Sequence, residues 1–312
     1  MNTISVSGFP TLRALVWLRQ LLGATWLANG MFHFLAWVRS PGAAARLLAA
    51  FDQTAAAPAW LKPVLGALHD GIVLAGAGPV AGVVILVELL VGFALLSGFR
   101  VRFFILLGLA YSLFCWLALD ALGYPYVHGQ TDPGVFVNYA LAFLFAWRAQ
   151  DLVEGAPPAE DAFRRERILF GLLWAFDAAL KWQPYFLTHF MGQLLPAAAG
   201  QPAWIAAYIH GIAALVNWVG PIPVAVLVAL AETLIAASLL SGRMLRFTVP
   251  LGALYCLAVW SSAEGFGGPY GLTGTGVRGD VIGNVLVYVY LFAYLWLGSA
   301  RRPVFTRNIA AR

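Results

Sequence analysis

Long apolar stretches separated by short polar ones run through most of the chain. A helix that crosses the hydrocarbon core of a bilayer needs about 20 mostly apolar residues. The pattern predicts eight such helices, near residues 15–37, 79–98, 101–119, 134–150, 167–184, 221–241, 246–262 and 281–299. The sequence therefore predicts an all-α integral membrane protein with eight transmembrane helices.

Two further apolar stretches, 64–78 and 203–219, fit a spanning helix less well. His69 and Asp70 fall in the middle of the first stretch, and charged groups inside a bilayer are costly. We expect neither stretch to span. Each is predicted to lie as a short helix over the outer end of a bundle, where it covers a polar site.

The distribution of basic residues sets the predicted orientation. With eight spans and a cytoplasmic N-terminus, 14 of the 19 Lys and Arg residues fall on one side and five on the other. Short cytoplasmic loops carry an excess of Lys and Arg. Both termini are therefore expected in the cytoplasm, which makes this a multi-pass protein.

Composition excludes several other classes of protein. The chain has 312 residues, of which 61% are hydrophobic and 11% charged, and its mean hydropathy is +0.80. Soluble domains are about 25% charged, so a soluble enzyme, a nucleic-acid-binding protein and a disordered chain are excluded. The two Cys residues form no CxxC pair, which excludes a disulfide scaffold, c-type haem attachment and a thiolate metal cluster.

The chain repeats itself internally. At an offset of 144 residues, the segment 79–126 aligns with 223–270 without a gap, and 21 of the 48 positions are identical, including Glu88 with Glu232. The first helices of the two units align at an offset of 148. Apolar composition alone does not place a Glu, an Arg, two Trp and a GxPY motif in register, so the sequence indicates a tandem duplication.

The duplication predicts the domain organisation. Residues 1–150 form the first four-helix unit, 151–166 a polar cytoplasmic linker and 167–312 the second unit. Because each unit has an even number of spans, the two units should be parallel four-helix bundles related by a pseudo-two-fold axis along the membrane normal.

Four ionisable residues fall inside predicted spans. Glu88 and Glu232 occupy the same position in the two repeats, and Asp177 and Lys181 stand one turn apart on one helix face. Such residues inside a membrane are functional candidates. Two structural alternatives stay open: each Glu bridges two helices by accepting hydrogen bonds, and Asp177 with Lys181 forms an internal ion pair.

The first repeat carries different residues at the positions of that pair. The offset of 148 places Asn29 opposite Asp177 and His33 opposite Lys181, and Asp120 matches Glu264 at the end of the third helix of each unit. The second repeat therefore holds more charge, and we expect it to contain the main site.

Both units, about 15–150 and 167–300, resemble a known family, and the second unit fits it better. Its motifs are Arg167, Gly171 and Lys181 on the first helix, a leucine-rich run from Glu232 to Arg243, the segment WSSAEGFGGPY from Trp260 to Tyr270, and Asp280. These resemble the DoxX/DoxD-like membrane protein superfamily, and in particular the DoxD subunit of thiosulfate:quinone oxidoreductase. The resemblance implies a four-helix unit in a bacterial or archaeal cytoplasmic (inner) membrane.

The resemblance also implies an activity, namely oxidation of thiosulfate or a similar reduced sulfur compound on the outer face, coupled to quinone reduction. The implied catalytic residues are Asp177, Lys181, Glu232 and Glu264. The implied substrate-binding residues are Lys181, Arg278, Tyr270 and Trp260. Their first-repeat counterparts are Asn29, His33, Glu88 and Asp120.

Quinone is the expected electron acceptor, and no haem, flavin or metal is predicted, because the five His residues lack helical spacing for a shared ligand. Expected partners are membrane lipid, quinone, and a small partner subunit or a second copy of the chain, with no nucleic acid. Two other functions stay open: a non-enzymatic anchor or assembly partner for redox proteins, and a small-anion transporter.

Overall fold

Helices make up nearly all of the described chain. The computed structural model describes residues 9–39, 42, 57–127, 129–157, 161–267 and 283–299, and no strand occurs among them. Helices long and apolar enough to cross a membrane number four in this part of the chain, at Thr11–Arg39, Ala77–Ser97, Val101–Ala118 and Pro221–Ser241. The protein is thus all-helical over its described residues, with four candidate membrane-spanning helices.

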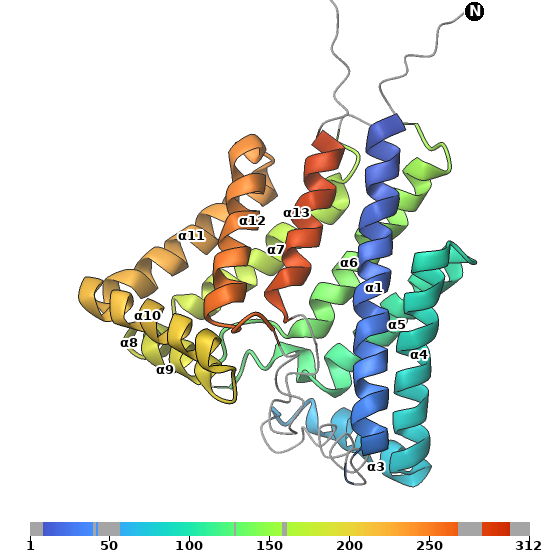
Figure 1. The fold of residues 1–312 in the computed structure, drawn as a ribbon, viewed down its shortest axis with the longest axis horizontal. Helices are drawn as coiled ribbons and strands as arrows, with labels where there is room; N and C mark the ends of the chain where they lie inside the picture. The colour runs from blue at the N-terminus through green and yellow to red at the C-terminus, as the bar shows by residue number, and fades with distance from the viewer. Residues whose placement is uncertain are drawn as a thin grey trace, which may run out of the picture.

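The linker divides the helices into two halves, which meet side by side (Figure 1). The first half, up to residue 157, contains α1 (Phe9–Arg39), α3 (Lys62–Ala75), α4 (Ala77–Ser97), α5 (Val101–Ala118), the short η2 (Ala121–Gly123) and α6 (Val135–Val153). The second half, from residue 161, contains α7 (Arg164–Lys181), α8 (Pro184–Thr188), α9 (Phe190–Leu194), η3 (Leu195–Ala198), α10 (Ala203–Val219), α11 (Pro221–Ser241), α12 (Leu245–Ser262) and α13 (Val285–Ser299). Each of the eight stretches predicted to be helical is a helix in this structure.

The outward faces of these helices carry large apolar side chains. Val83, Leu86 and Phe93 of α4 are 61%, 54% and 58% exposed, and Leu227 and Leu234 of α11 are 62% and 69% exposed. A protein surrounded by water rarely exposes continuous apolar surface of this kind. Lipid chains are the environment in which these faces are stable.

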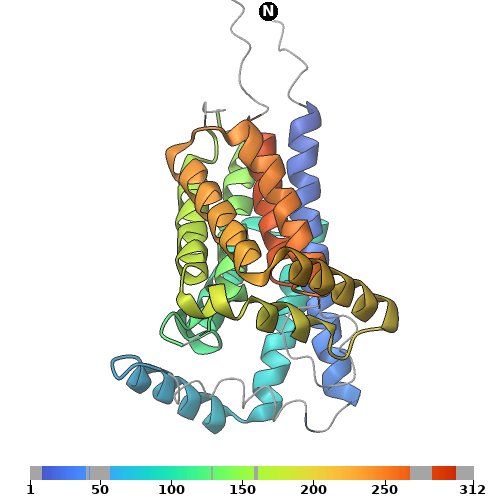
Figure 2. The ribbon, with the colours of Figure 1, turned by 90° about the vertical axis from the view of Figure 1, so that its left-hand side faces the viewer.

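The helices α3 and α10 lie across the others, at the end of the molecule far from the N-terminus (Figure 2). They have 14 and 17 residues, or roughly 21 and 26 Å at 1.5 Å per residue, which is less than the hydrocarbon thickness of about 30 Å. Leu65 of α3 packs near Ala121 after α5, and Ile205 of α10 packs near Ala263 after α12. Each therefore packs against residues at the end of a longer helix.

Matching tight turns join α4 to α5 and α11 to α12. Gly98 and Gly242 end the preceding helices with φ of 82° and 71°, and the turns continue through Arg100 and Met244 with φ of 40° and 57°. Glycine adopts this left-handed conformation without the steric cost of a Cβ atom. The shared Ser-Gly sequence therefore gives the same reversal in both halves.

A buried tryptophan forms the centre of the core in each half. Trp26 and Trp174 are 3% and 1% exposed. Three aromatic contacts recur at matching positions. Trp26 lies 5.6, 5.6 and 4.9 Å from Tyr111, Tyr139 and Phe143 between ring centroids, and Trp174 lies 5.9, 5.2 and 6.0 Å from Tyr255, Tyr288 and Phe292. The repeated sequence thus repeats its packing as well.

The last helices of the two halves correspond at an offset of 149, because Phe143 packs on Gly108 as Phe292 packs on Gly252. The asparagines near the start of these helices, Asn138 and Asn284, could be paired in the two sequences, but they are 146 residues apart and so are not equivalent. Instead, the Asn138 amide donates a hydrogen bond to the Asn284 side chain. These two residues join α6 to the start of α13 where the halves meet.

Candidate functional site

An ion pair inside the second half is the centre of the candidate site. Lys181, at the end of α7, places its Nζ 3.5 Å from Glu232 Oε2 on α11, and the two side chains are only 13% and 6% exposed. These helices pack closely because Gly171 of α7 has no side chain to separate it from Leu240 of α11. The sequence left open an ion pair between Lys181 and Asp177; among the ion pairs of the described residues, Lys181 is joined to Glu232 instead.

Two tyrosines donate hydrogen bonds to the carboxylates of this site. Tyr255 of α12 donates to Glu232 Oε1 at 2.7 Å, and Tyr288 of α13 donates to Asp177 Oδ2 at 2.7 Å. Hydrogen bonds to charged groups are worth more than neutral ones. Four helices, α7, α11, α12 and α13, thus each contribute a polar side chain to one buried cluster.

The first half completes this cluster. Lys181 Nζ donates a hydrogen bond to the carbonyl oxygen of Thr131, in the loop before α6. The neighbouring Asp132 Oδ1 accepts from Asn284 Nδ2 at 3.3 Å and from the Gly134 N–H at 2.9 Å. The ammonium of Lys181 is therefore held by residues from both halves.

The corresponding positions of the first half form a second polar cluster. His33 Nδ1 lies 2.7 Å from Glu88 Oε2, and Tyr111 donates to Glu88 Oε1 at 3.4 Å. Asn29 Nδ2 donates to the hydroxyl of Tyr139 at 3.4 Å. The contacts match those of the second half residue for residue, with an imidazole in place of the ammonium and an amide in place of the Asp177 carboxylate.

Space and unpaired polar atoms accompany both clusters. Glu88, Asn29 and Tyr139 border a cavity of about 10 Å³, which is about the space one water needs. Among the described residues, Trp26 Nε1, Trp174 Nε1 and Asp177 Oδ1 are buried without a hydrogen-bond partner. Buried polar atoms of this kind call for water, a proton or a ligand.

Asp120 and Glu264 have a different environment, at the ends of α5 and α12. Asp120 Oδ2 accepts the Phe136 N–H at 3.2 Å. Glu264 accepts the N–H groups of Asn284 and Val285 at 3.1–3.2 Å. Each carboxylate therefore caps the beginning of the next long helix, where the N–H groups have no helical partner.

Burial changes the acidity of the Asp120 cap. Removal of the carboxylate from water raises the pKa of Asp120 to about 7, and the nearby charge of Asp132 raises it further, while the N–H groups of Phe136 and Val135 oppose the shift. This group thus changes its charge close to neutral pH.

The remaining predicted residues lie apart from the ion pair or outside the described chain. Trp260 lies beside Gly283, which is also in contact with Glu264, so these two belong to the cap of α13. Tyr270 and Arg278 lie outside the described residues. Sequence reasoning did not single out Thr131, Tyr255 or Tyr288. The two tyrosines could have been found, because each has a tyrosine counterpart in the first half.

Comparisons of the chain with protein-family models, with curated proteins and with solved structures find no match. Within the described ranges, no three His, Cys, Asp or Glu side chains lie together as a metal site would require. The described cluster offers the chemistry of its own groups. A buried ammonium attracts an anion, and two carboxylates with tyrosine donors can hold or pass protons.

Proposed function

We propose that the chain crosses a bacterial or archaeal cytoplasmic membrane eight times, with both termini in the cytoplasm. Two parallel four-helix bundles, related by a pseudo-two-fold axis along the membrane normal, account for the repeated contacts. The matched tryptophan clusters, the matched glycine turns and the matched pairs His33–Glu88 and Lys181–Glu232 support this arrangement. The crosswise helices α3 and α10 are then outer caps rather than spans.

We further propose that the protein is a membrane oxidoreductase that oxidises thiosulfate, or a similar reduced sulfur anion, and reduces quinone. The observation that carries this proposal is the Lys181–Glu232 ion pair, buried in an apolar bundle with Asp177 one turn away. An ionisable cluster is expensive to bury, and such clusters in membranes are typical of ion and proton sites.

The residues fit the balance of this reaction. Two thiosulfate ions form one S–S bond, give tetrathionate and release two electrons. A quinone takes up the two electrons together with two protons and becomes a quinol. Lys181 would attract the dianion, and Glu232 with Asp177 would deliver protons toward the quinone, which enters from the lipid.

The test is quinone reduction by the purified full-length protein with thiosulfate, sulfite and sulfide as donors. We expect activity with a sulfur anion, loss of more than 90% in Lys181→Met and in Glu232→Gln, and retention of most activity in the first-half variants His33→Gln and Glu88→Gln. Each variant is first shown to fold by thermal melting in detergent, since an unpaired buried charge also destabilises a protein.

Other outcomes would contradict the oxidoreductase. Thiosulfate uptake into proteoliposomes without quinone reduction would show a small-anion transporter. A protein that is inactive but tightly bound to a redox partner would be an anchor or assembly factor. Equal losses in both sets of variants would show that the two halves act as one site.

A further inference from the structure

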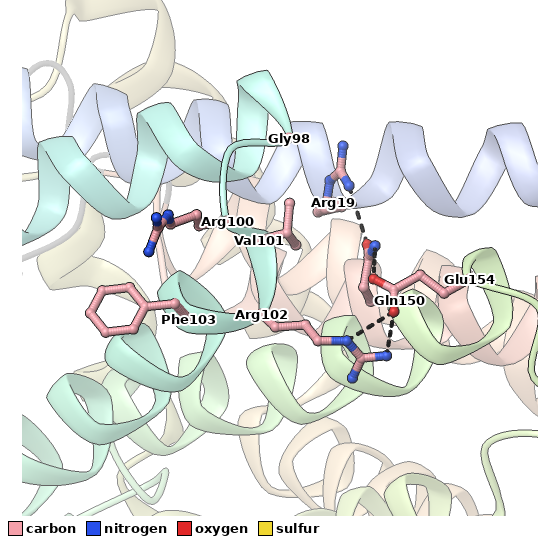
Figure 3. Close-up of a pocket in the computed structure, with 8 residues that line it drawn as sticks. All are labelled: Arg19, Gly98, Arg100, Val101, Arg102, Phe103, Gln150 and Glu154. Carbon is pink, nitrogen blue, oxygen red and sulfur yellow. Dashed lines mark hydrogen bonds and ion pairs between the residues drawn. The ribbon is translucent and has the colours of Figure 1, made fainter.

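A cavity of about 500 Å³ opens at the turn between α4 and α5, far from the ion pair. Arg19 of α1, Arg100 and Arg102 at the turn, and Gln150 and Glu154 at the end of α6 are among its lining residues (Figure 3). Three arginines and one glutamate therefore line the cavity, and Figure 3 shows Arg100 on the opposite side of the turn from Arg19 and Arg102.

The guanidinium groups are unequally neutralised. Arg102 is paired with Glu154 at 2.7 Å and with Asp151 at 2.8 Å. Arg19 donates to the Leu95 carbonyl oxygen at 3.1 Å and to Gln150 Oε1 at 3.2 Å, both of which are uncharged acceptors. Within the described part of the chain, Arg100 has no acidic partner, so the cavity wall keeps an excess of positive charge.

The equivalent turn of the second half places its arginines differently, with Arg243 directly before the position that corresponds to Arg100. Arg167 occupies the place of Arg19, but it forms an ion pair with Asp161 at 3.1 Å. Met244 stands in the place of Arg100, with the same left-handed backbone conformation. The left-handed position of the turn therefore forms with or without a charged side chain.

The cavity also lies at a membrane surface. It borders the turn between α4 and α5, which are both candidate membrane-spanning helices. Phe99 and Phe103, on either side of Arg100, are 55% and 60% exposed. Arginine beside exposed aromatic rings is suited to the interface, where lipid phosphates meet the first part of the acyl chains.

We propose that this cavity binds a phosphate group, such as an anionic phospholipid carries at the membrane surface. Arg100, which has no acidic partner in the described part of the chain, binds the phosphate oxygens, and guanidinium groups match phosphate in geometry as well as in charge. Gln150 supplies an uncharged amide to the head group. The exposed rings of Phe99 and Phe103 contact the chains of the same lipid.

The test uses the full-length protein in a neutral detergent, with phosphatidylglycerol as the probe and zwitterionic phosphatidylcholine as its comparison. Native mass spectrometry counts the bound lipids, and a titration followed by thermal melting gives the apparent Kd. We expect one tightly bound phosphatidylglycerol. Arg100→Met, which copies the second half, should bind it about five-fold more weakly, because each basic residue near a lipid surface contributes about 1 kcal/mol.

Arg243→Met is the matched control, because it removes the same charge from the equivalent turn of the second half. It should bind the lipid as the unaltered protein does. Equal weakening in both variants, or equal binding of phosphatidylcholine, would overturn the proposal.

Glycerol phosphate and inorganic phosphate distinguish the two sources of the phosphate group. If neither competes with phosphatidylglycerol, the occupant is a membrane lipid. If both compete and both bind more weakly to Arg100→Met, the site takes a free phosphate from the aqueous phase. Binding of any of these phosphates that does not depend on Arg100 would contradict the assignment.

Discussion

The ammonium of Lys181 in the second half donates a hydrogen bond to the carbonyl oxygen of Thr131 in the first half. The same ammonium lies 3.5 Å from Glu232. A site whose ion pair lies in the second repeat is therefore completed by the first. The loop before α6 is part of the candidate site although its sequence carries no recognisable motif.

The Lys181–Glu232 pair should show strong energetic coupling. Removing one partner leaves a buried charge alone, at a cost of about 3–5 kcal/mol, so Lys181→Met and Glu232→Gln should each lower the melting temperature clearly. The double variant should be more stable than the sum of the two losses predicts. Melting of the three variants in detergent checks this, and simple additivity would contradict it.

Two glycines should be required by the aromatic packing. A Cβ atom at Gly108 would lie 2.2 Å from Phe143, and one at Gly252 would lie 2.4 Å from Phe292. We expect Gly108→Ala and Gly252→Ala each to cost about 1–3 kcal/mol by overpacking. Gly82→Ala on α4 is the control, because nothing lies within 4 Å of its added atom. Similar melting of all three variants would contradict the matched packing.

The contribution of Asp120 to the free energy of unfolding should fall as the pH rises toward neutrality. The folded protein holds the pKa of Asp120 at about 7, above its ordinary value of 3.8. The folded state therefore binds this proton more tightly than the unfolded state does. The stabilisation from Asp120 is complete below pH of about 4, decreases between about 4 and 7, and is absent above that range.

The variant Asp120→Asn isolates this effect, because the amide oxygen can still accept the Phe136 N–H. Its melting temperature should depend less on pH between about 4 and 7 than that of the unaltered protein. The difference corresponds to a few kcal/mol at most, since one pKa unit is about 1.4 kcal/mol. Parallel pH profiles for the two proteins would show that Asp120 does not titrate in this range.

Accessibility of introduced cysteines tests the proposed topology. Cys115 and Cys256 are buried, so the thiol reagent should label the unaltered protein only weakly. A membrane-impermeant thiol reagent added to intact cells from outside should label Trp60→Cys, next to α3, where the native side chain is 68% exposed. It should label Arg164→Cys only after the membrane is opened. Labelling of Arg164→Cys in intact cells would reverse the orientation.

Periodic and repeated features of the chain were predictable from sequence, and irregular ones were not. Glu88 and Glu232 could be placed on matching helices because a helix of about 20 residues fixes the depth of each side chain. The equivalence of His33 with Lys181 followed from the offset of the first helices. Both predictions rest on regular backbone, in which position along the chain determines position in space.

The loops follow no such rule. Glu264 accepts the N–H groups at the start of α13, a contact that the sequence did not indicate. The offset between the halves changes from 144 at Tyr126 and Tyr270 to 149 at Phe143 and Phe292, because the intervening segment is five residues longer in the second half. Lys181 and Thr131 are 50 residues apart in sequence, and no local pattern indicates their contact.

The contact between Lys181 and Thr131 makes the two halves mutually dependent. A fragment that begins after the linker would keep Glu232 beside the ammonium but would lack the carbonyl oxygen and Asp132 that the first half supplies. Neither duplicated segment is therefore a self-sufficient unit. A mutation in either duplicated segment therefore acts on a cluster that the other segment helps to build. Two fragments expressed separately would regain the cluster only by reassembling.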